Sequence, residues 1–140
     1  MPTVCWPVSP TGRYDIDVAL AGAGSRCGID LGLTDPLAAI GFELDPMLFD
    51  QFMNTGCITK LQRRERRDSS GARTKLTVGE MSAQLLDPQS RQPVGPVVTV
   101  HAARGARGLH SRAGVEFFHR LTGCRVVWDL DTRMWCVECP

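Results

Sequence analysis

Residues 14–30, YDIDVALAGAGSRCGID, carry the clearest structural pattern in this 140-residue chain. Apolar or aromatic side chains occupy every second position of residues 14–20, and a period of two is typical of a half-buried strand. The glycine-containing segment 22–25 predicts a turn, after which residues 26–29 can return as a second strand. Asp30 therefore directly follows a predicted β-hairpin.

The flanking sequence predicts further strands and at most two short helices. Asp45 and Pro46 indicate a helix start, because aspartate caps the first turn and proline fits its first position. Residues 114–121 also have helical spacing. Further strands are expected at 57–61, 73–78, 81–86, 97–101, 124–130 and 133–138, with loops at 87–96 and 102–112. No strand-helix-strand unit repeats, so we predict a mostly β fold, a small closed β-barrel with one or two short helices.

Composition and charge exclude several classes of protein. The apolar fraction of 43% and the charged fraction of 22% fit one folded domain and not a disordered chain. A net charge of +1 argues against nucleic acid as the main partner. No apolar run approaches the roughly 20 residues that span a bilayer, and the first ten residues do not resemble a secretory signal. We therefore expect a cytoplasmic protein with no membrane partner.

Six cysteines are scattered along the chain: Cys5, Cys27, Cys57, Cys124, Cys136 and Cys139. The size of the domain and the missing signal favour buried free thiols over a disulfide framework. The only C-x-x-C pair has no second pair to complete a zinc site, and the three histidines lack ligand spacing. We therefore predict no metal site.

Three segments resemble retropepsin-like aspartic proteases. Residues 18–34 are similar to the unit in which that family runs a β-hairpin into Asp-Thr/Ser-Gly-Ala-Ser/Thr. Residues 112–118, RAGVEFF, are similar to the segment that opens its C-terminal helix, and 127–133, VWDLDTR, to its closing hairpin. Between these, the basic hairpin 60–75 stands where the family carries its flap.

The resemblance implies a fold and a set of site residues. The fold would be the closed acid-protease barrel over residues 14–140, preceded by an irregular lead-in at 1–13 that could serve as a dimer strand. Asp30 would be the catalytic carboxylate. The other implied positions are the active-site loop (Leu31, Gly32, Leu33, Thr34), the flap (Arg67, Asp68, Ser69, Ser70, Gly71) and a helix-loop support (Gly114, Glu116).

The implied chemistry is peptide hydrolysis by two carboxylates that share one proton. This chain supplies one such loop, so the resemblance implies a homodimer in which Asp30 of each subunit faces the other across a two-fold axis. The substrate would be a peptide or protein, and no cofactor is needed.

Two leucines depart from the family pattern. Leu31 stands where the family has threonine or serine and offers no hydrogen-bonding group, and Leu33 replaces a small alanine. A non-catalytic dimerisation or peptide-binding module of the same fold is therefore an alternative. A third hypothesis is a small β-barrel that binds nucleic acid through the basic hairpin 60–75.

Overall fold

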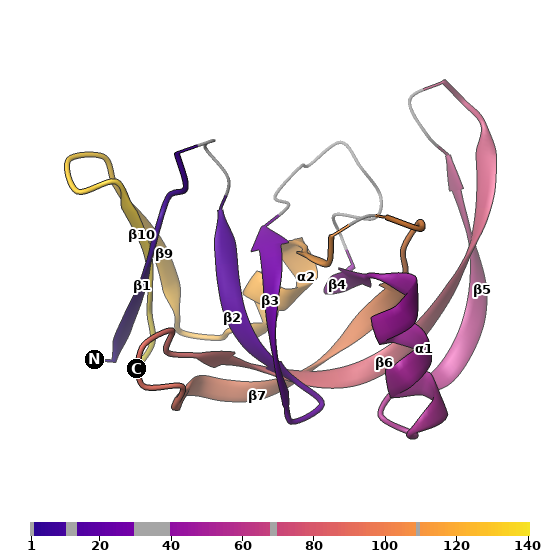
Figure 1. Ribbon diagram of the computed structural model, residues 1–140, viewed down its shortest axis with the longest axis horizontal. Helices are drawn as coiled ribbons and strands as arrows, with labels where there is room; N and C mark the ends of the chain where they lie inside the picture. Colours follow the sequence, from indigo (N-terminus) through magenta and orange to yellow (C-terminus); the bar gives the residue numbers. More distant parts are fainter. Residues whose placement is uncertain (1, 11–13, 30–39, 68–69, 109) are drawn as a thin grey trace.

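The computed structural model describes residues 2–10, 14–29, 40–67, 70–108 and 110–140 (Figure 1). Three strands form one sheet, in the order β1 (Thr3–Pro7), β10 (Met134–Glu138), β9 (Arg125–Asp129). Seven strands form the other, in the order β2 (Asp15–Leu20), β3 (Ala23–Ile29), β8 (Arg112–Ala113), β4 (Phe42–Leu44), β7 (Pro93–Arg104), β6 (Arg73–Leu86), β5 (Thr59–Arg67). Two helices, α1 (Pro46–Asn54) and α2 (Val115–Arg120), accompany them. The described chain is thus mostly β with two short helices, as predicted.

The β2–β3 hairpin forms where the alternating pattern predicts it. Its strands pair antiparallel from Asp15 opposite Gly28 to Leu20 opposite Ala23. The turn is tighter than the predicted segment, because Ala21 and Gly22 alone form it, with φ angles of 49° and 89°. Two consecutive positive φ angles match the right-handed twist of a two-residue hairpin.

The seven-stranded sheet curls around the core. β2 pairs with β3 on one side and with β6 on the other, where Val18 lies opposite Leu85. Large side chains from both sheets and both helices fill the interior, among them Trp6, Ile16, Phe42, Phe49, Leu85, Phe117 and Trp135. Burial of this apolar surface is the main driving force for the fold.

The two central strands are longer than the sequence predicts. β6 continues unbroken through Gly79, which pairs with Ala102 of β7. β7 takes in part of both segments expected as loops, 87–96 and 102–112. Prolines are tolerated at strand starts and irregular pairings. Pro93 begins β7, and the register shifts close by, between Ala83 and Leu85 of β6.

The N-terminal segment is not an irregular lead-in. β1 pairs antiparallel with β10, so that Trp6 lies opposite Trp135. The prolines that suggested irregularity flank this strand, because Pro2 precedes it and Pro7 ends it. β1 therefore closes a sheet within its own chain, and a part in a dimer stays a prediction.

The expectation of free thiols is wrong for four of the six cysteines. Cys5 is bonded to Cys136, and Cys124 to Cys139, while Cys27 and Cys57 are free. Strand register explains the first bridge, because β1 and β10 place Cys5 opposite Cys136 across 131 residues of sequence. Disulfides are typical of oxidising compartments, which weighs against the cytoplasmic location expected from the sequence.

Helix α1 begins at the predicted cap. The Asp45 carboxylate accepts a hydrogen bond of 3.2 Å from the Met47 backbone N–H, and Pro46 opens the first turn. Phe49 and Phe52 point into the core, whereas Met47 is 81% exposed. In the part of the chain that the structure describes, no helix has the length and apolarity that crossing a membrane would need.

Candidate active site

The predicted catalytic loop, Asp30 with Leu31, Gly32, Leu33 and Thr34, lies outside the described residues. The strands on either side of it are described. β3 ends at Ile29 and β4 begins at Phe42, and β8 lies between these two strands in the sheet. The strand before this segment and the strand after it therefore both pair with the same short strand, β8.

Backbone hydrogen bonds fix the chain that leads into Asp30. The Gly28 N–H donates to the Ser111 carbonyl and the Ile29 N–H to the Tyr14 carbonyl, both at 2.9 Å. Ile29 is paired with Ala113 of β8 in parallel register. Asp30 thus follows a residue held on both sides, as its prediction requires.

Gly114 and Glu116 brace the helix that follows β8. The Gly114 N–H donates to the Gly41 carbonyl at 2.9 Å, just before β4. One Glu116 oxygen accepts from the His101 backbone N–H at 2.6 Å, and the other lies 3.0 Å from His101 Nδ1. Glu116 therefore ties α2 to β7, while Gly114 ties it to the segment next to β4. Their role as support for the catalytic loop stays a prediction.

Glu43 and Arg112 form an ion pair that sequence reasoning missed. Arg112 Nη2 donates to Glu43 Oε2 at 2.5 Å, and the Glu43 side chain is only 8% exposed. The Asp45 N–H also donates to Ser111 Oγ at 3.1 Å. These contacts join the β4 region to the β8 region, and β8 also pairs with β3 just before Asp30. The one feature of the sequence that could have indicated this pair is Glu43, an acidic residue inside the otherwise uncharged run 40–44.

The predicted flap is the β5–β6 hairpin. Arg67, opposite Arg73, is the last paired residue of β5, and Gly71 turns with a φ of 85°. Ser70 and Gly71 are exposed. The remaining predicted flap residues, Asp68 and Ser69, lie outside the described residues.

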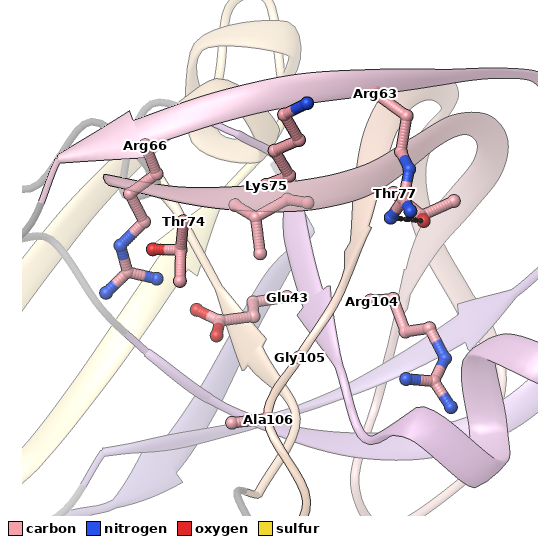
Figure 2. Close-up of a pocket in the computed structure, with 10 residues that line it drawn as sticks. Glu43, Arg63, Arg66, Thr74, Lys75, Thr77, Arg104, Gly105 and Ala106 are labelled. Carbon is pink, nitrogen blue, oxygen red and sulfur yellow. Dashed lines mark hydrogen bonds between the residues drawn. The ribbon is translucent and has the colours of Figure 1, made fainter. Parts of the chain in front are cut away.

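A hollow of about 380 Å³ lies between this hairpin and β4 (Figure 2). We call it the hairpin hollow, and its lining residues are Glu43, Arg63, Arg66, Thr74, Lys75, Leu76, Thr77, Arg104, Gly105 and Ala106. Its volume falls within the roughly 300–1,000 Å³ of small-ligand sites. Four of these side chains are basic and one is acidic, so the lining is positively charged.

Two of the charged groups in the lining are paired. Arg104 donates to both carboxylate oxygens of Asp50 on α1, at 3.0 and 3.1 Å. The hydrogen bond from Arg104 lowers the pKa of Asp50 below its usual value, and Asp50 raises the pKa of Arg104 in turn. The second pair is Glu43 with Arg112.

A second hollow, of about 370 Å³, lies near the tip of the β9–β10 hairpin. It is lined by Val8, Ser9, Pro10, Tyr14, Trp128, Asp129, Leu130, Arg133 and Met134. Leu130 is 86% exposed there.

In the described ranges, no three His, Cys, Asp or Glu residues gather as metal ligands would. The C-x-x-C pair is divided between the two disulfides.

Comparison with known proteins identifies the fold. No protein-family model and no curated protein matches the sequence. The crystal structure of a retropepsin-like aspartic protease from Rickettsia conorii matches with a TM-score of 0.61 and 14% identity, over 99% of this chain and 91% of that chain. An identity this low establishes the fold alone, since one fold can host different functions. The chain therefore has a retropepsin-like fold.

Proposed function

We propose that this chain is one subunit of a homodimeric aspartic endopeptidase and that Asp30 is its catalytic residue. Asp30 of each subunit would stand close to the other, and the two carboxyl groups would share one proton. The ionised carboxylate would draw a proton from water as the water attacks the peptide carbonyl. The protonated one would donate to the carbonyl oxygen.

The observation that carries this proposal is the match in fold over nearly the whole chain, together with the position of Asp30 directly after β3. A retropepsin-like fold makes a closed acid-protease barrel the architecture to expect. One chain of this size has one such loop, so a two-fold partner is needed to supply the second carboxylate. Substrate would enter between the β5–β6 hairpin and the loop that begins at Asp30.

The departures at Leu31 and Leu33 favour a second candidate, a non-catalytic dimerisation or peptide-binding module. Leucine at position 31 cannot make the hydrogen bonds of a threonine or serine, and each lost bond costs about 1 kcal/mol. The basic hairpin 60–75 similarly keeps nucleic-acid binding as a third candidate.

Replacing Asp30 by asparagine tests the proposal. A synthetic peptide library is digested with the wild-type chain and with Asp30→Asn from pH 4 to pH 8, and cleavage is read by mass spectrometry. We expect the wild type to cut and the variant to show no cleavage above background, because an amide cannot act as acid or base. Sedimentation should show both proteins as dimers. Cleavage that survives the substitution would refute the assignment, and a wild type that cuts nothing would favour the non-catalytic module.

A further inference from the structure

We infer that the hairpin hollow binds an acidic side chain of the bound peptide and that Arg63 is the residue that selects it. The inference rests on the proposed function, since it names the class of peptide that the same site would take. It is carried by the position of Arg63, by the pairing of the charges around it and by the size and lining of the hollow.

Arg63 is held in an orientation suited to a ligand. It lies on β5 opposite Thr77 of β6, and its Nη1 donates to Thr77 Oγ1 at 3.3 Å. Figure 2 shows this guanidinium beside the Thr77 hydroxyl, on the side of the hairpin that faces Gly105. One hydrogen bond leaves most of the five N–H donors of the guanidinium available to a carboxylate.

Two arginines near the hollow have acidic partners, and Arg66, a further basic residue of the lining, also has an interaction of its own. Arg104 is occupied by Asp50, and Arg73 lies 3.5 Å from Glu65. The ammonium group of Lys75 points away from Glu43 in Figure 2. In the described ranges of the chain, Arg63 bonds to a hydroxyl, and no carboxylate lies within ion-pair distance of it. An acidic ligand would therefore meet a charge that the fold has not neutralised.

The hollow suits a peptide side chain better than a polynucleotide. Its volume of about 380 Å³ accommodates a side chain and a short stretch of backbone. A nucleic-acid strand brings one phosphate per nucleotide and needs a groove that follows its backbone, whereas this hollow is a single compact site. None of the ten described lining residues is aromatic, so bases would have nothing to stack on.

The hollow is connected to the two strands that flank the segment holding the predicted catalytic loop. Glu43 lies in its wall and, through Arg112, joins β4 to β8, the strand that lies between β3 and β4 in the sheet. A carboxylate bound by Arg63 would thus position the peptide backbone near that loop. Arg63 would act as a specificity-determining residue and would take no part in the chemistry.

The test compares peptides that differ by one charge. Fluorescein-labelled octapeptides of neutral residues carry a single glutamate, scanned through all positions, and each is matched by a peptide with glutamine there. Binding to the dimer of the Asp30→Asn variant is measured by fluorescence anisotropy at 50 and 200 mM salt. We expect one or two positions at which glutamate binds about tenfold tighter than glutamine, as a charge-assisted hydrogen bond predicts.

Two arginine variants assign that preference to the hollow. Arg63→Gln, added to Asp30→Asn, should bring the glutamate-to-glutamine ratio of Kd values close to one. The matched control is Arg64→Gln, which removes the same charge from the next residue of β5, a residue outside the lining of the hollow. The control should keep at least half of the preference at both salt concentrations.

Three outcomes would overturn the inference: equal binding of the paired peptides, an equal loss in both arginine variants, or tighter binding of a generic single-stranded oligonucleotide that depends on Arg63. Its failure is distinct from failure of the proposed function. Cleavage by the wild type without any preference for glutamate would refute the inference but would still support the proposed protease function. An Arg63-dependent preference in a chain that cuts no peptide would support the inference and refute the protease.

Discussion

The three-stranded sheet and the β5–β6 hairpin stand at opposite ends of the molecule and are stabilised by different means (Figure 1). In the sheet, Trp6 stacks on Trp135 with ring centroids 4.8 Å apart, and both indoles are buried. A disulfide joins the same two strands at Cys5 and Cys136. This end of the molecule combines a packed core with a covalent bond.

The outer part of the hairpin, residues 61–67 and 73–75, has neither a buried side chain nor a disulfide. Eight of the nine residues of β5 are exposed, and this strand is the last in the seven-stranded sheet. Its ion pairs, such as Glu65 with Arg73, lie on the surface, where such pairs contribute little. Regions with few buried contacts open at low free-energy cost. The comparison indicates that the three-stranded sheet stabilises the fold, whereas the outer part of the β5–β6 hairpin can change its conformation when a ligand binds.

The largest expected effect comes from breaking the terminal sheet with Trp135→Ala. The substitution removes a fully buried indole that also packs against Phe118 and Trp128. Truncating a buried tryptophan costs about 3–5 kcal/mol. Urea unfolding should show this loss in the free energy of unfolding. The control, Leu61→Ala on the hairpin, removes a side chain that is 49% exposed and should cost under about 1 kcal/mol. Similar losses in the two variants would contradict the comparison.

Cys27 is a free, buried cysteine in β3, the strand that leads into Asp30. Its thiol provides a second test of how well a strand of the core is buried. Burial, followed by the nearby carboxylates of Asp15 and Asp17, raises the pKa of Cys27 from 9.0 to about 12. As pH rises above about 9, the unfolded chain loses this proton while the folded chain keeps it. Stability must therefore fall with rising pH, by at most about 1.4 kcal/mol per pH unit.

Cys27→Ala isolates this dependence. Between pH 8 and pH 10 the wild type should lose about 1 kcal/mol more free energy of unfolding than the variant, because only the wild type carries the titrating thiol. Urea unfolding at the two pH values measures the difference. Parallel pH profiles for the two proteins would mean that the thiol in β3 is not sealed from solvent.

Much of the fold could be predicted from sequence, because local patterns specify local elements. The alternation in residues 14–20 predicted β2, and Asp45 with Pro46 predicted the start of α1. Non-local pairing could not be predicted in this way. Residues 3–7 show no alternation clear enough to distinguish β1 from a loop. Nothing in the sequence near Cys5 shows that Cys136 lies opposite it.

The candidate site shows the same difference between local patterns, which the sequence reveals, and non-local pairing, which it does not. Asp30 was identified from its place after a local hairpin and from its resemblance to a family motif, and it remains a prediction. The pairing of Glu43 with Arg112 was missed, because the two residues come from different strands that only the fold brings together. A sequence motif locates a loop, whereas the residues that shape a groove are brought together only by strand order.

The smallest expected effect comes from the hairpin surface. Glu65→Gln removes the ion pair with Arg73, whose side chains are 53% and 60% exposed. Exposed pairs of this kind contribute about 0.2–1 kcal/mol, so thermal unfolding should shift by only a few degrees at most. Hydrogen exchange should quicken in β5 and β6 near residues 65 and 73 and stay unchanged in β1 and β10. A destabilisation as large as that of Trp135→Ala would mean that the outer hairpin is part of the cooperative core, and it would argue against the proposed role of this hairpin as a mobile flap.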